Sequence, residues 1–365
     1  MKKILIIAQG GLNRGGIQTV IMNYVRNLSA NYRFDIVLFT NEIRDYDDEF
    51  MSYGGSIFRI CYTNNSSRLG RQKEKFLRAT KGYYDLMRII NNNGPYEAIH
   101  CHNGIESITA LKAARKCGIK KRITQAHVIF DDSSNNIIFR LKNLYLKWQI
   151  KRNSTLQIGC SDFACRSSFL GRYQVILNPY NETLFKGDDK VNTSFSSPVL
   201  IQVGNLSDLK NQMYSLRIIK RIKQIYPDCL ARIIGSGDQT YERSLRDYIK
   251  NNDLKNNVIF YPASSDIPTL MNESSYLIQP SRTESFCIVL VEAQVMGLSC
   301  FASDVIPEEA NAGGVRYLSI KDDPKKWADA IIADFKQTKG MHKVYDCNKY
   351  KSSEITKIID LIYKD

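Results

Sequence analysis

Two glutamates are the residues whose types and spacing point most directly to chemistry. Glu284 and Glu292 lie in YLIQPSRTESFCIVLVEAQVMG, with seven residues between them. If a helix begins near Phe286–Cys287, its first amides face the space beside Glu284, and Glu292 lies about one and a half turns along. Each carboxylate can bind a pair of neighbouring hydroxyls, one pair on a sugar and one on a ribose. Glu292 could instead be an ordinary surface residue, but the apolar run CIVLVEAQVMG indicates burial, where a carboxylate needs a partner.

Two loops of this chain could bind an anionic group. In VLIQVGNLSDLKNQ, Gly204 and Asn205 follow a strand and Lys210 precedes a helix. Lys210 would place a point charge on a diphosphate leaving group, or it is simply a solvated lysine at a helix start. Gly15 and Gly16, in GGLNRGGIQTV, lie where backbone N–H groups and a helix dipole attract phosphate, although a tight turn has the same spacing. The loop with Gly15 and Gly16 has neither the pattern typical of NTP hydrolysis nor the one typical of NAD binding.

Histidines and cysteines are distributed in a way that disfavours a metal site. The four histidines, at 100, 102, 127 and 342, are too scattered for a zinc signature. The nine cysteines include no C-x-x-C pair, which is typical of reduced cytosolic thiols. Asp45 and Asp47 form an Asp-x-Asp that we expect in a solvated loop, without a metal ion.

Alternating strands and helices must position these residues. Short apolar runs alternate with helix-period segments in the first half, and the second half resumes this order after LNPYNETLFKGDDKVNTSFSSP, which has the composition of a linker. We expect strands at 3–8, 34–39, 56–60, 98–101, 122–126, 155–159, 199–203, 231–234, 258–261, 276–279 and 299–302. We expect helices at 17–29, 71–92, 105–117, 138–151, 211–226, 239–252, 267–273, 288–297 and 325–336. The fold class is therefore α/β, with two Rossmann-like doubly wound domains facing a central cleft.

The net charge of +14 lies in the first half of the chain. Residues 1–180 hold 27 Lys and Arg against 13 Asp and Glu, an excess of 14, whereas residues 181–365 hold 24 of each kind. A basic half indicates an anionic partner, unless the charge reflects a generally basic proteome. Within RLKNLYLKWQIKR, at 140–152, the residues Leu141, Leu144, Tyr145 and Trp148 have helical spacing among basic residues. Such a helix can lie in a membrane interface, although the same stripe is more often a core face with a solvated rim.

Several segments, in order, resemble one known family. They are RGGIQTV, AIHCHN, RITQAH, LNPYN, VGNLSDLKN, PSRTESFCIVLVEAQVMGL and ASDVIPEEA. Together they resemble the family-4 retaining glycosyltransferases, particularly bacterial members that build capsular polysaccharides and exopolysaccharides. The resemblance spans nearly the whole chain and implies the GT-B architecture. It implies an acceptor-binding domain at 1–180, joined by a C-terminal helix at about 346–365, and a nucleotide-sugar-binding domain at 181–345.

The resemblance also implies which residues contact the diphosphate of the donor. Gly15 and Gly16 would lie beside it, as would Gly204 and Asn205, and Lys210 would neutralise it. The family often has arginine where this chain has Asn205. One positive charge is therefore missing, and Lys210 carries more of the neutralisation.

Other matching positions would contact the sugar and the ribose. Glu284 would bind hydroxyls of the transferred sugar, assisted by the backbone N–H groups of Phe286 and Cys287, and Glu292 would bind the ribose. The resemblance implies no cofactor and no metal, and it favours a UDP-sugar as the donor.

Histidines would line the acceptor side. His127 lies where the family has an active-site imidazole near the sugar and the acceptor. His102 ends an earlier strand on the same face, or it is a packed histidine at a strand end. His100 is expected to alternate away from His102 and to be structural. Gln125 replaces a histidine that the family usually has, which leaves the catalytic assignment of His127 less complete.

The resemblance therefore implies a retaining, metal-independent hexosyltransferase. The acceptor would be a glycan, free or linked to a polyprenyl diphosphate, for capsule or exopolysaccharide synthesis. The sequence contains no well-placed nucleophile, so we favour front-face attack over a covalent intermediate. We expect a cytoplasmic protein whose basic half docks on the anionic inner face of the cell membrane. A sugar-nucleotide epimerase would share the architecture, and a nucleic-acid-binding protein would share the charge, but no nucleic-acid-binding motif is recognisable.

Overall fold

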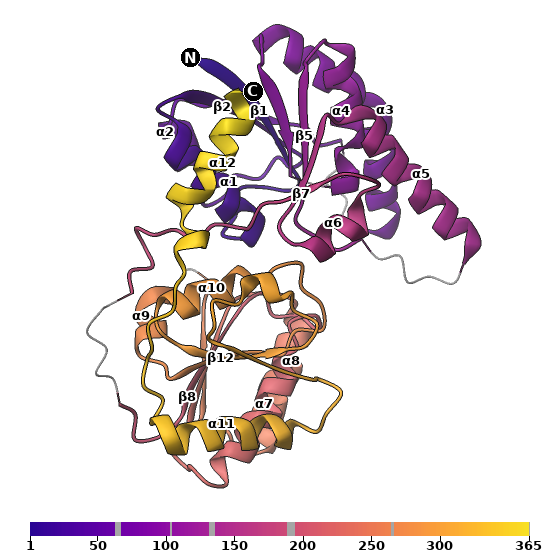
Figure 1. Ribbon diagram of the computed structural model, residues 1–365. Coiled ribbons are helices and arrows are strands. Elements are labelled where there is room, and N and C mark those ends of the chain that lie inside the picture. Colours follow the sequence, from indigo (N-terminus) through magenta and orange to yellow (C-terminus); the bar gives the residue numbers. More distant parts are fainter. Residues whose placement is uncertain (63–66, 103, 131–135, 188–193, 264–265, 365) are drawn as a thin grey trace. The chain divides into compact units, whose positions relative to one another are not determined.

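The structure of the chain, a computed structural model, consists of two compact units. It describes all residues except 63–66, 103, 131–135, 188–193, 264–265 and 365. The first unit comprises Met1–Pro179 together with Ser352–Asp365, and the second comprises Tyr180–Lys351 (Figure 1). The expected linker at 177–198 lies partly outside the described residues. The last helix thus belongs to the same unit as the first strand.

A seven-stranded parallel sheet forms the centre of the first unit. Its strand order is β3-β2-β1-β4-β5-β6-β7. Five consecutive residues of β1 and all four of β4 are buried, which explains why these strands are nearly continuous apolar runs without alternation. The strands are β1 Lys2–Ala8, β2 Tyr32–Leu38, β3 Ile57–Arg59, β4 Ala98–Cys101, β5 Lys121–Ala126, β6 Leu156–Gly159 and β7 Gln174–Val175.

Helices cover both faces of this sheet. On one face, α1 and α12 share a core in which Tyr24 of α1 and Ile359 of α12 are fully buried. On the other face, α3 and α4 pack against the sheet, and α5 packs beside α4. The helices are α1 Gly16–Leu28, α2 Asp47–Ser52, α3 Arg68–Asn93, α4 Ile108–Lys116, α5 Ile137–Asn153, α6 Asp162–Ser168 and α12 Ser352–Lys364.

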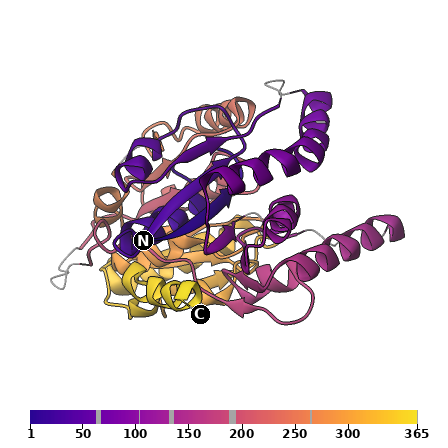
Figure 2. The same cartoon turned by 90° about the horizontal axis from the view of Figure 1, so that it is seen from above.

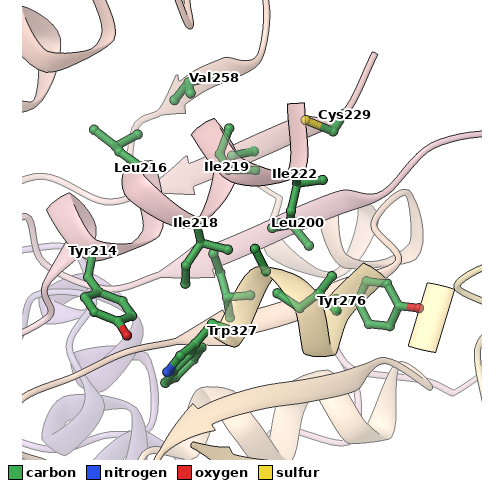
Figure 3. Packing of buried hydrophobic residues seen from close by; sticks show 14 of the residues in the cluster. Leu200, Tyr214, Leu216, Ile218, Ile219, Ile222, Cys229, Val258, Tyr276 and Trp327 are labelled. Atoms are coloured by element: carbon green, nitrogen blue, oxygen red, sulfur yellow. The ribbon is translucent and has the colours of Figure 1, made fainter. Parts of the chain in front are cut away.

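The second unit contains a six-stranded parallel sheet. Its strand order is β10-β9-β8-β11-β12-β13. The strands are β8 Val199–Val203, β9 Leu230–Ile234, β10 Val258–Tyr261, β11 Tyr276–Gln279, β12 Ser299–Ser303 and β13 Val315–Leu318. The helices are α7 Gln212–Lys223, α8 Gln239–Asn251, α9 Ile267–Asn272, α10 Ile288–Val295 and α11 Pro324–Thr338. Two of them, α7 and α11, build the core shown in Figure 3, where the ring of Trp327 packs edge-on against Tyr214 at 5.6 Å between centroids.

Strand order reverses at one point in each sheet. From β1 the chain continues outward to β2 and β3 on one side, and from β4 to β7 on the other. From β8 it continues to β9 and β10 on one side, and from β11 to β13 on the other. Loops that follow the two central strands therefore leave the sheet side by side, which is where open α/β sheets bind ligands. These loops carry Gly15, Gly16 and His102 in the first unit, and Gly204, Lys210 and Glu284 in the second.

The structure confirms the α/β fold class and adds elements that the sequence did not indicate. The edge strands β7 and β13 are short and partly or fully exposed, so they lack a long apolar run. The helices α2 and α6 have 6 and 7 residues, too few to show a helical period. The expectation of a solvated loop is wrong for Asp47, which begins α2, is buried and forms an ion pair with Arg59.

The helix α5 is exposed where a core face was the more common interpretation. Leu141, Leu144, Tyr145 and Trp148 are 42–58% exposed, so they do not form part of the core. Figures 1 and 2 both show the N-terminal half of α5 extending beyond the other elements of the first unit. Among the residues that the structure describes, no helix has both the length and the apolar character needed to cross a bilayer.

The packing of α12 predicts which unit depends on the C-terminal helix. We expect Ile359→Ala, at a fully buried position, to destabilise the first unit by about 2–5 kcal/mol, because it removes core volume and leaves a cavity. In hydrogen exchange, β1 and β4 should lose protection while β8 and β11 keep theirs. The control Leu361→Ala, at a position 59% exposed on the same helix, should change little. Equal loss of protection in both units would contradict this division of the fold.

Candidate functional site

Close backbone contacts shape the loops after β8 and β9. A Cβ on Gly235 would lie 2.1 Å from the carbonyl oxygen of Gly204, and one on Gly237 would lie 2.2 Å from that of Leu206. Because both neighbours are backbone atoms, no side-chain movement could relieve these contacts. Gly235 and Gly237 therefore serve the packing of the two loops, and they fix the course of the chain that leads to Lys210.

Lys210 and Glu284 form an ion pair at the point where the second sheet reverses its order. Lys210 lies in the loop after β8, and Glu284 lies in the loop after the neighbouring strand β11. Nζ of the lysine contacts Oε1 of the glutamate, and the side chains are only 28% and 10% exposed. Burial by itself lowers the pKa of Lys210, but the charge of Glu284, the charge of Cys287 and the hydrogen bond to Glu284 together outweigh burial and hold that pKa above its ordinary value. The lysine is therefore a fixed positive charge.

Neighbouring polar groups hold the glutamate in place. Its Oε1 also accepts hydrogen bonds from the hydroxyl of Ser281 at 2.9 Å and from Nε2 of Gln279 at 3.4 Å. The hydroxyl of Ser303, at the end of β12, donates to the carbonyl oxygen of Ser281 at 2.6 Å. The carboxylate is thus oriented by two successive strand ends.

The lysine side is anchored in the same way. Nε2 of Gln202 donates to the carbonyl oxygen of Lys210 at 2.8 Å, and Gln202 in turn accepts from the hydroxyl of Ser215 at 2.7 Å. Nδ2 of Asn211 donates to the carbonyl oxygen of Pro280 at 3.0 Å, which ties the loop after β8 to the loop after β11. The positions of both charges are therefore set by the protein before any ligand binds.

Glu292 is buried on the helix that follows the glutamate loop. This helix, α10, begins after Cys287, close to the position expected from the sequence. Glu292 is only 7% exposed, and burial raises the pKa of its carboxyl group to about 8. Burial also raises the pKa of the Cys287 thiol. Negative charge on Glu284 and Glu292 raises this pKa further, and the charge of Lys210 lowers it. All three ionisable groups therefore lie within electrostatic reach of the Cys287 sulfur, at the start of α10.

Helices that begin beside the ion pair differ from the others of the second unit. At the starts of α8, α9 and α11, the side chains of Asp238, Asp266 and Asp323 accept hydrogen bonds from amides of the first turn. The cap residues of α7 and α10, Asn211 and Cys287, make no such bond, and the side chain that meets the first turn of α7 is the neutral hydroxyl of Tyr241, which accepts from the N–H of Met213 at 3.3 Å. Their first turns lack a capping carboxylate that would repel an anion. These two helix starts therefore suit a negatively charged ligand.

The glycines at the start of α1 have a similar setting in the first unit. Gly15 caps the helix without a side chain, and the first turn contains no acidic residue. A Cβ on Gly16 would meet no atom within 4 Å, so packing inside the protein does not require glycine at this position. The loop leaves room in front of the helix, where N–H groups and the helix dipole attract anions.

Three histidine rings stack near the carboxyl ends of β4 and β5. The ring centroids of His100 and His102 are 4.2 Å apart, and those of His102 and His127 are 5.2 Å apart. Nδ1 of His102 lies 3.0 Å from Nε2 of His127. The expectation that His100 alternates away from His102 is wrong, because residues two positions apart in a strand project from the same face. Nδ1 of His100 pairs with the hydroxyl of Tyr363 at 2.7 Å.

These histidines are neutral near pH 7. Burial lowers the pKa of His100 to about 3 and that of His127 to about 4, and it lowers the pKa of His102 well below the ordinary value. A neutral imidazole donates a hydrogen bond at one nitrogen and accepts one at the other. His127 can therefore contact a hydroxyl group, but it brings no positive charge to the site.

Sequence reasoning missed the residues that support these groups. Gln125, which replaces the family's histidine, donates to the hydroxyl of Tyr24 at 3.2 Å, and the ring of Tyr24 stacks on His100 at 6.1 Å. Tyr363 carried no signal because its partner is 263 positions away along the chain. Ser281 did carry one, since it is a hydroxyl three positions before Glu284 in the segment already singled out.

A protein-family comparison identifies the second unit. Residues 187–350 match the family model described as Glycosyl transferases group 1. Over nearly its whole length, the second unit is thus similar to a group 1 glycosyl transferase domain. It contains Lys210, Glu284 and Glu292, the three charged residues gathered at the start of α10.

Two curated proteins are similar to this chain over most of its length. EpsF of Bacillus subtilis (strain 168), which carries a provisional glycosyltransferase name, is 27% identical over 347 residues, covering 90% of this chain and 87% of the relative. The UDP-Gal:alpha-D-GlcNAc-diphosphoundecaprenol alpha-1,3-galactosyltransferase of Escherichia coli is 22% identical over 309 residues, covering 80% of this chain and 76% of the relative. The resemblance to exopolysaccharide-type glycosyltransferases is thereby confirmed.

Solved structures confirm the fold. Anabaena Alr3699/HepE, in complex with UDP and glucose, is similar over 100% of both chains with a TM-score of 0.79 at 16% identity. Together with the two parallel sheets, this similarity establishes the GT-B fold. The family match and the relatives make the chain a glycosyltransferase.

Burial of Glu292 predicts a pH dependence of stability. Between its ordinary value and about 8, the folded protein keeps a proton that the unfolded chain has released. Stability should therefore fall as pH rises through this range, by up to about 1.4 kcal/mol per pH unit. We expect Glu292→Gln to remove this slope, measured by denaturant unfolding with the emission of Trp327 in a Trp148→Phe background. The exposed control Glu308→Gln should keep the slope of the parent. Parallel profiles for Glu292→Gln and its parent would contradict the burial of a protonated carboxyl.

Proposed function

We propose that the chain is a retaining hexosyltransferase that transfers a sugar from a UDP-sugar to a lipid-linked or free glycan. The observation that carries the proposal is the Lys210–Glu284 pair, set between two uncapped helix starts where the second sheet reverses its order. Such a place offers positive charge and helix starts without a capping carboxylate for phosphates, and a carboxylate for hydroxyls, within one short distance. A nucleotide-sugar presents these two kinds of group next to each other.

Donor binding is assigned to the second unit. Lys210 and the amides at the start of α7, with Gly204 and Asn205, contact the diphosphate. Glu284 binds hydroxyls of the sugar, together with the backbone N–H groups of Phe286 and Cys287. Glu292, protonated in the free protein at pH 7, donates to one ribose hydroxyl and accepts from the other. UDP is favoured as the nucleotide because the similar structure of HepE contains UDP and glucose.

Acceptor binding is assigned to the first unit. Its stack of neutral histidines provides hydrogen-bonding groups for a hydroxyl. Gly15 and Gly16, at the start of α1, stay assigned to the donor diphosphate, and Gly16 leaves room there. The relative from Escherichia coli is named for an acceptor on diphosphoundecaprenol, which supports a polyprenyl-diphosphate-linked glycan here. With the similarity to EpsF, this favours a role in capsule or exopolysaccharide synthesis.

The proposed reaction proceeds by front-face attack. The acceptor oxygen forms a bond to the anomeric carbon as the bond from that carbon to the β-phosphate oxygen breaks, with both electrons leaving on the nucleoside diphosphate. The proton of the acceptor hydroxyl moves to the departing phosphate oxygen. Lys210 and the helix starts stabilise the charge that develops there, so that no metal ion is required. Glu284 binds hydroxyls and does not attack, because Lys210 and Ser281 already engage its Oε1.

The donor assignment can be tested without an acceptor. We expect UDP and UDP-hexoses to raise the melting temperature of the second unit, whereas GDP and TDP raise it less, because a ligand stabilises the state that binds it. The same incubation should leave the sugar of each UDP-hexose unchanged, as followed by proton NMR. Conversion of one UDP-hexose into its epimer would show that the chain is an epimerase. No shift with any nucleotide would contradict the assignment.

Lys210 should matter for turnover more than for folding. We expect Lys210→Gln to lower kcat about 10²–10³-fold, since it removes charge from the leaving group. It should also destabilise the second unit by about 1–3 kcal/mol, because the Glu284 carboxylate loses its partner. The control Lys220→Gln, on the exposed side of α7, should change neither quantity.

A double variant separates the two effects of Lys210. In Lys210→Gln/Glu284→Gln both charges are gone, so stability should recover while transfer stays low. If Lys210→Gln kept kcat within a few-fold of the parent, neutralisation of the leaving group by this lysine would be excluded.

A further inference from the structure

A cavity of the second unit lies beside the C-terminal end of α10. Its volume is about 440 Å³, and every residue that lines it belongs to Tyr180–Lys351. One wall is formed by residues 295–297, where α10 ends, and another by residues 343–348, which lead from α11 toward α12 (Figure 1). The eight residues of α10 span about 12 Å, and the ion pair of Lys210 and Glu284 lies at the opposite end of this helix. The cavity is therefore separate from that ion pair.

Backbone contacts hold the walls of the cavity in place. The N–H of Lys343 donates to the carbonyl oxygen of Gly297 at 2.8 Å. A Cβ on Gly297 would lie 2.8 Å from the Cβ of His342, and its φ is +84°, so glycine allows the two walls to meet. At the other side, the N–H of Tyr180 donates to the carbonyl oxygen of Tyr350 at 3.0 Å. The cavity is therefore formed before a ligand binds, which lowers the cost of binding.

A buried hydroxyl in this cavity has no partner in the part of the chain that the structure describes. It belongs to Tyr180, which lines the cavity and is only 4% exposed. Burial, and then charge on Cys347 and Glu182, raise the pKa of Tyr180 to about 12. The hydroxyl thus lies near Cys347, which is 6% exposed and lines the same cavity. A buried hydroxyl without a hydrogen bond is costly, so this group is one that a ligand would engage.

The other polar groups of the cavity combine hydrogen-bond donors and acceptors. Lys343 and Lys351 can only donate, and neither forms an ion pair with a described residue. The carboxylate of Asp346 can only accept, whereas the amide of Asn348 does both. A sugar hydroxyl also donates and accepts, so it can use all of these groups. A phosphate group has acceptor oxygens and would meet the negative charge of Asp346. The mixed set therefore suits a neutral ligand that is rich in hydroxyls.

An aromatic ring gives the cavity an apolar wall. Tyr345 lines the cavity, and its ring packs so closely on Gly314 that a Cβ there would lie 2.7 Å from Cζ of the tyrosine. The hydroxyl of Tyr345 pairs with that of Ser299 at 3.0 Å, which fixes the ring. Small-molecule sites of about 300–1,000 Å³ combine such walls with a few placed polar groups. The C–H face of a sugar ring matches an aromatic wall, and its hydroxyls match the polar groups.

We propose that this cavity binds one or two sugar units of a glycan. Hydroxyls of the sugar bond to the phenol of Tyr180 and the amide of Asn348, and one face of the sugar ring packs on Tyr345. Lys343, Lys351 and Asp346 bond to further hydroxyls at the rim. The inference goes beyond the proposed function, because the sugar bound here lies away from the groups that are assigned to transfer.

Saturation-transfer NMR on the full chain measures this binding without any transfer reaction. With maltose, lactose and N,N′-diacetylchitobiose as probes, we expect saturation of at least one sugar. The signal should persist in Lys210→Gln/Glu284→Gln, which lacks the two charges assigned to the donor. Added NaCl should change the affinity little, since a neutral sugar forms no ion pair.

Two variants test the walls of the cavity, each with a matched control. We expect Tyr180→Phe to weaken binding about three- to ten-fold, because it removes one hydrogen bond. Asn348→Trp, at an exposed lining position, should fill the cavity and abolish binding. The controls Tyr226→Phe and Asn251→Trp, at positions outside the lining, should bind like the parent. The melting temperature of each variant shows whether it is folded.

The outcomes distinguish this inference from its alternative and from the proposed function. Unchanged binding in Asn348→Trp, or no binding of any of the three sugars, would overturn the glycan site. So would tighter binding of inorganic phosphate that weakens with salt and strengthens in Asp346→Asn, because it would assign the cavity to an anion. Sugar transfer without binding at the cavity would overturn only this inference. Binding at the cavity without any transfer would instead refute the proposed function and leave the glycan site standing.

Discussion

The ion pair between Lys210 and Glu284 is the constraint on which the second unit depends. A carboxylate that is 10% exposed needs a permanent cation, and the lysine comes from the loop after the neighbouring strand. The loops after β8 and β11 are therefore coupled, and the hydrogen bond from Asn211 to Pro280 reinforces that coupling. Aspartate side chains cap α8, α9 and α11, but not α7 and α10, which begin beside the ion pair. The positive ends of the dipoles of α7 and α10 therefore stay available next to the pair. The contacts that hold these two loops together and the charged groups of the candidate site therefore lie at the same edge of the second sheet.

The two units differ in the kind of polarity they present. The second has fixed charges, whereas the first has three stacked imidazoles that burial keeps neutral. The excess positive charge of the first half therefore does not come from its histidines, and part of it lies on the outer surfaces of α4 and α5. Net charge alone would have suggested a cationic site. The structure instead separates a neutral strand edge from a cationic outer surface.

Local patterns were sufficient for much of the fold. The buried strands and the long helices follow from apolar runs and helical periods, and the loop that carries Glu284 was recognisable from its own segment. Predictions failed where the deciding partner is distant in sequence or the element is short. The hydroxyl of Tyr363, on the last helix, pairs with His100, and Arg59 forms an ion pair with the buried Asp47. The stripe of α5 has a normal helical period, and only its surroundings show that it faces outward.

The position of α12 has a consequence for synthesis on the ribosome. Residues of the second unit emerge before Ser352–Lys364, although these last residues complete a core begun by β1 and α1. A nascent chain must therefore hold the first sheet and α1 without the helix that packs beside them while an entire second sheet is translated. Such a delay exposes apolar surface to misfolding and to chaperones. The histidine stack therefore acquires its tyrosine only after the whole second unit has been translated.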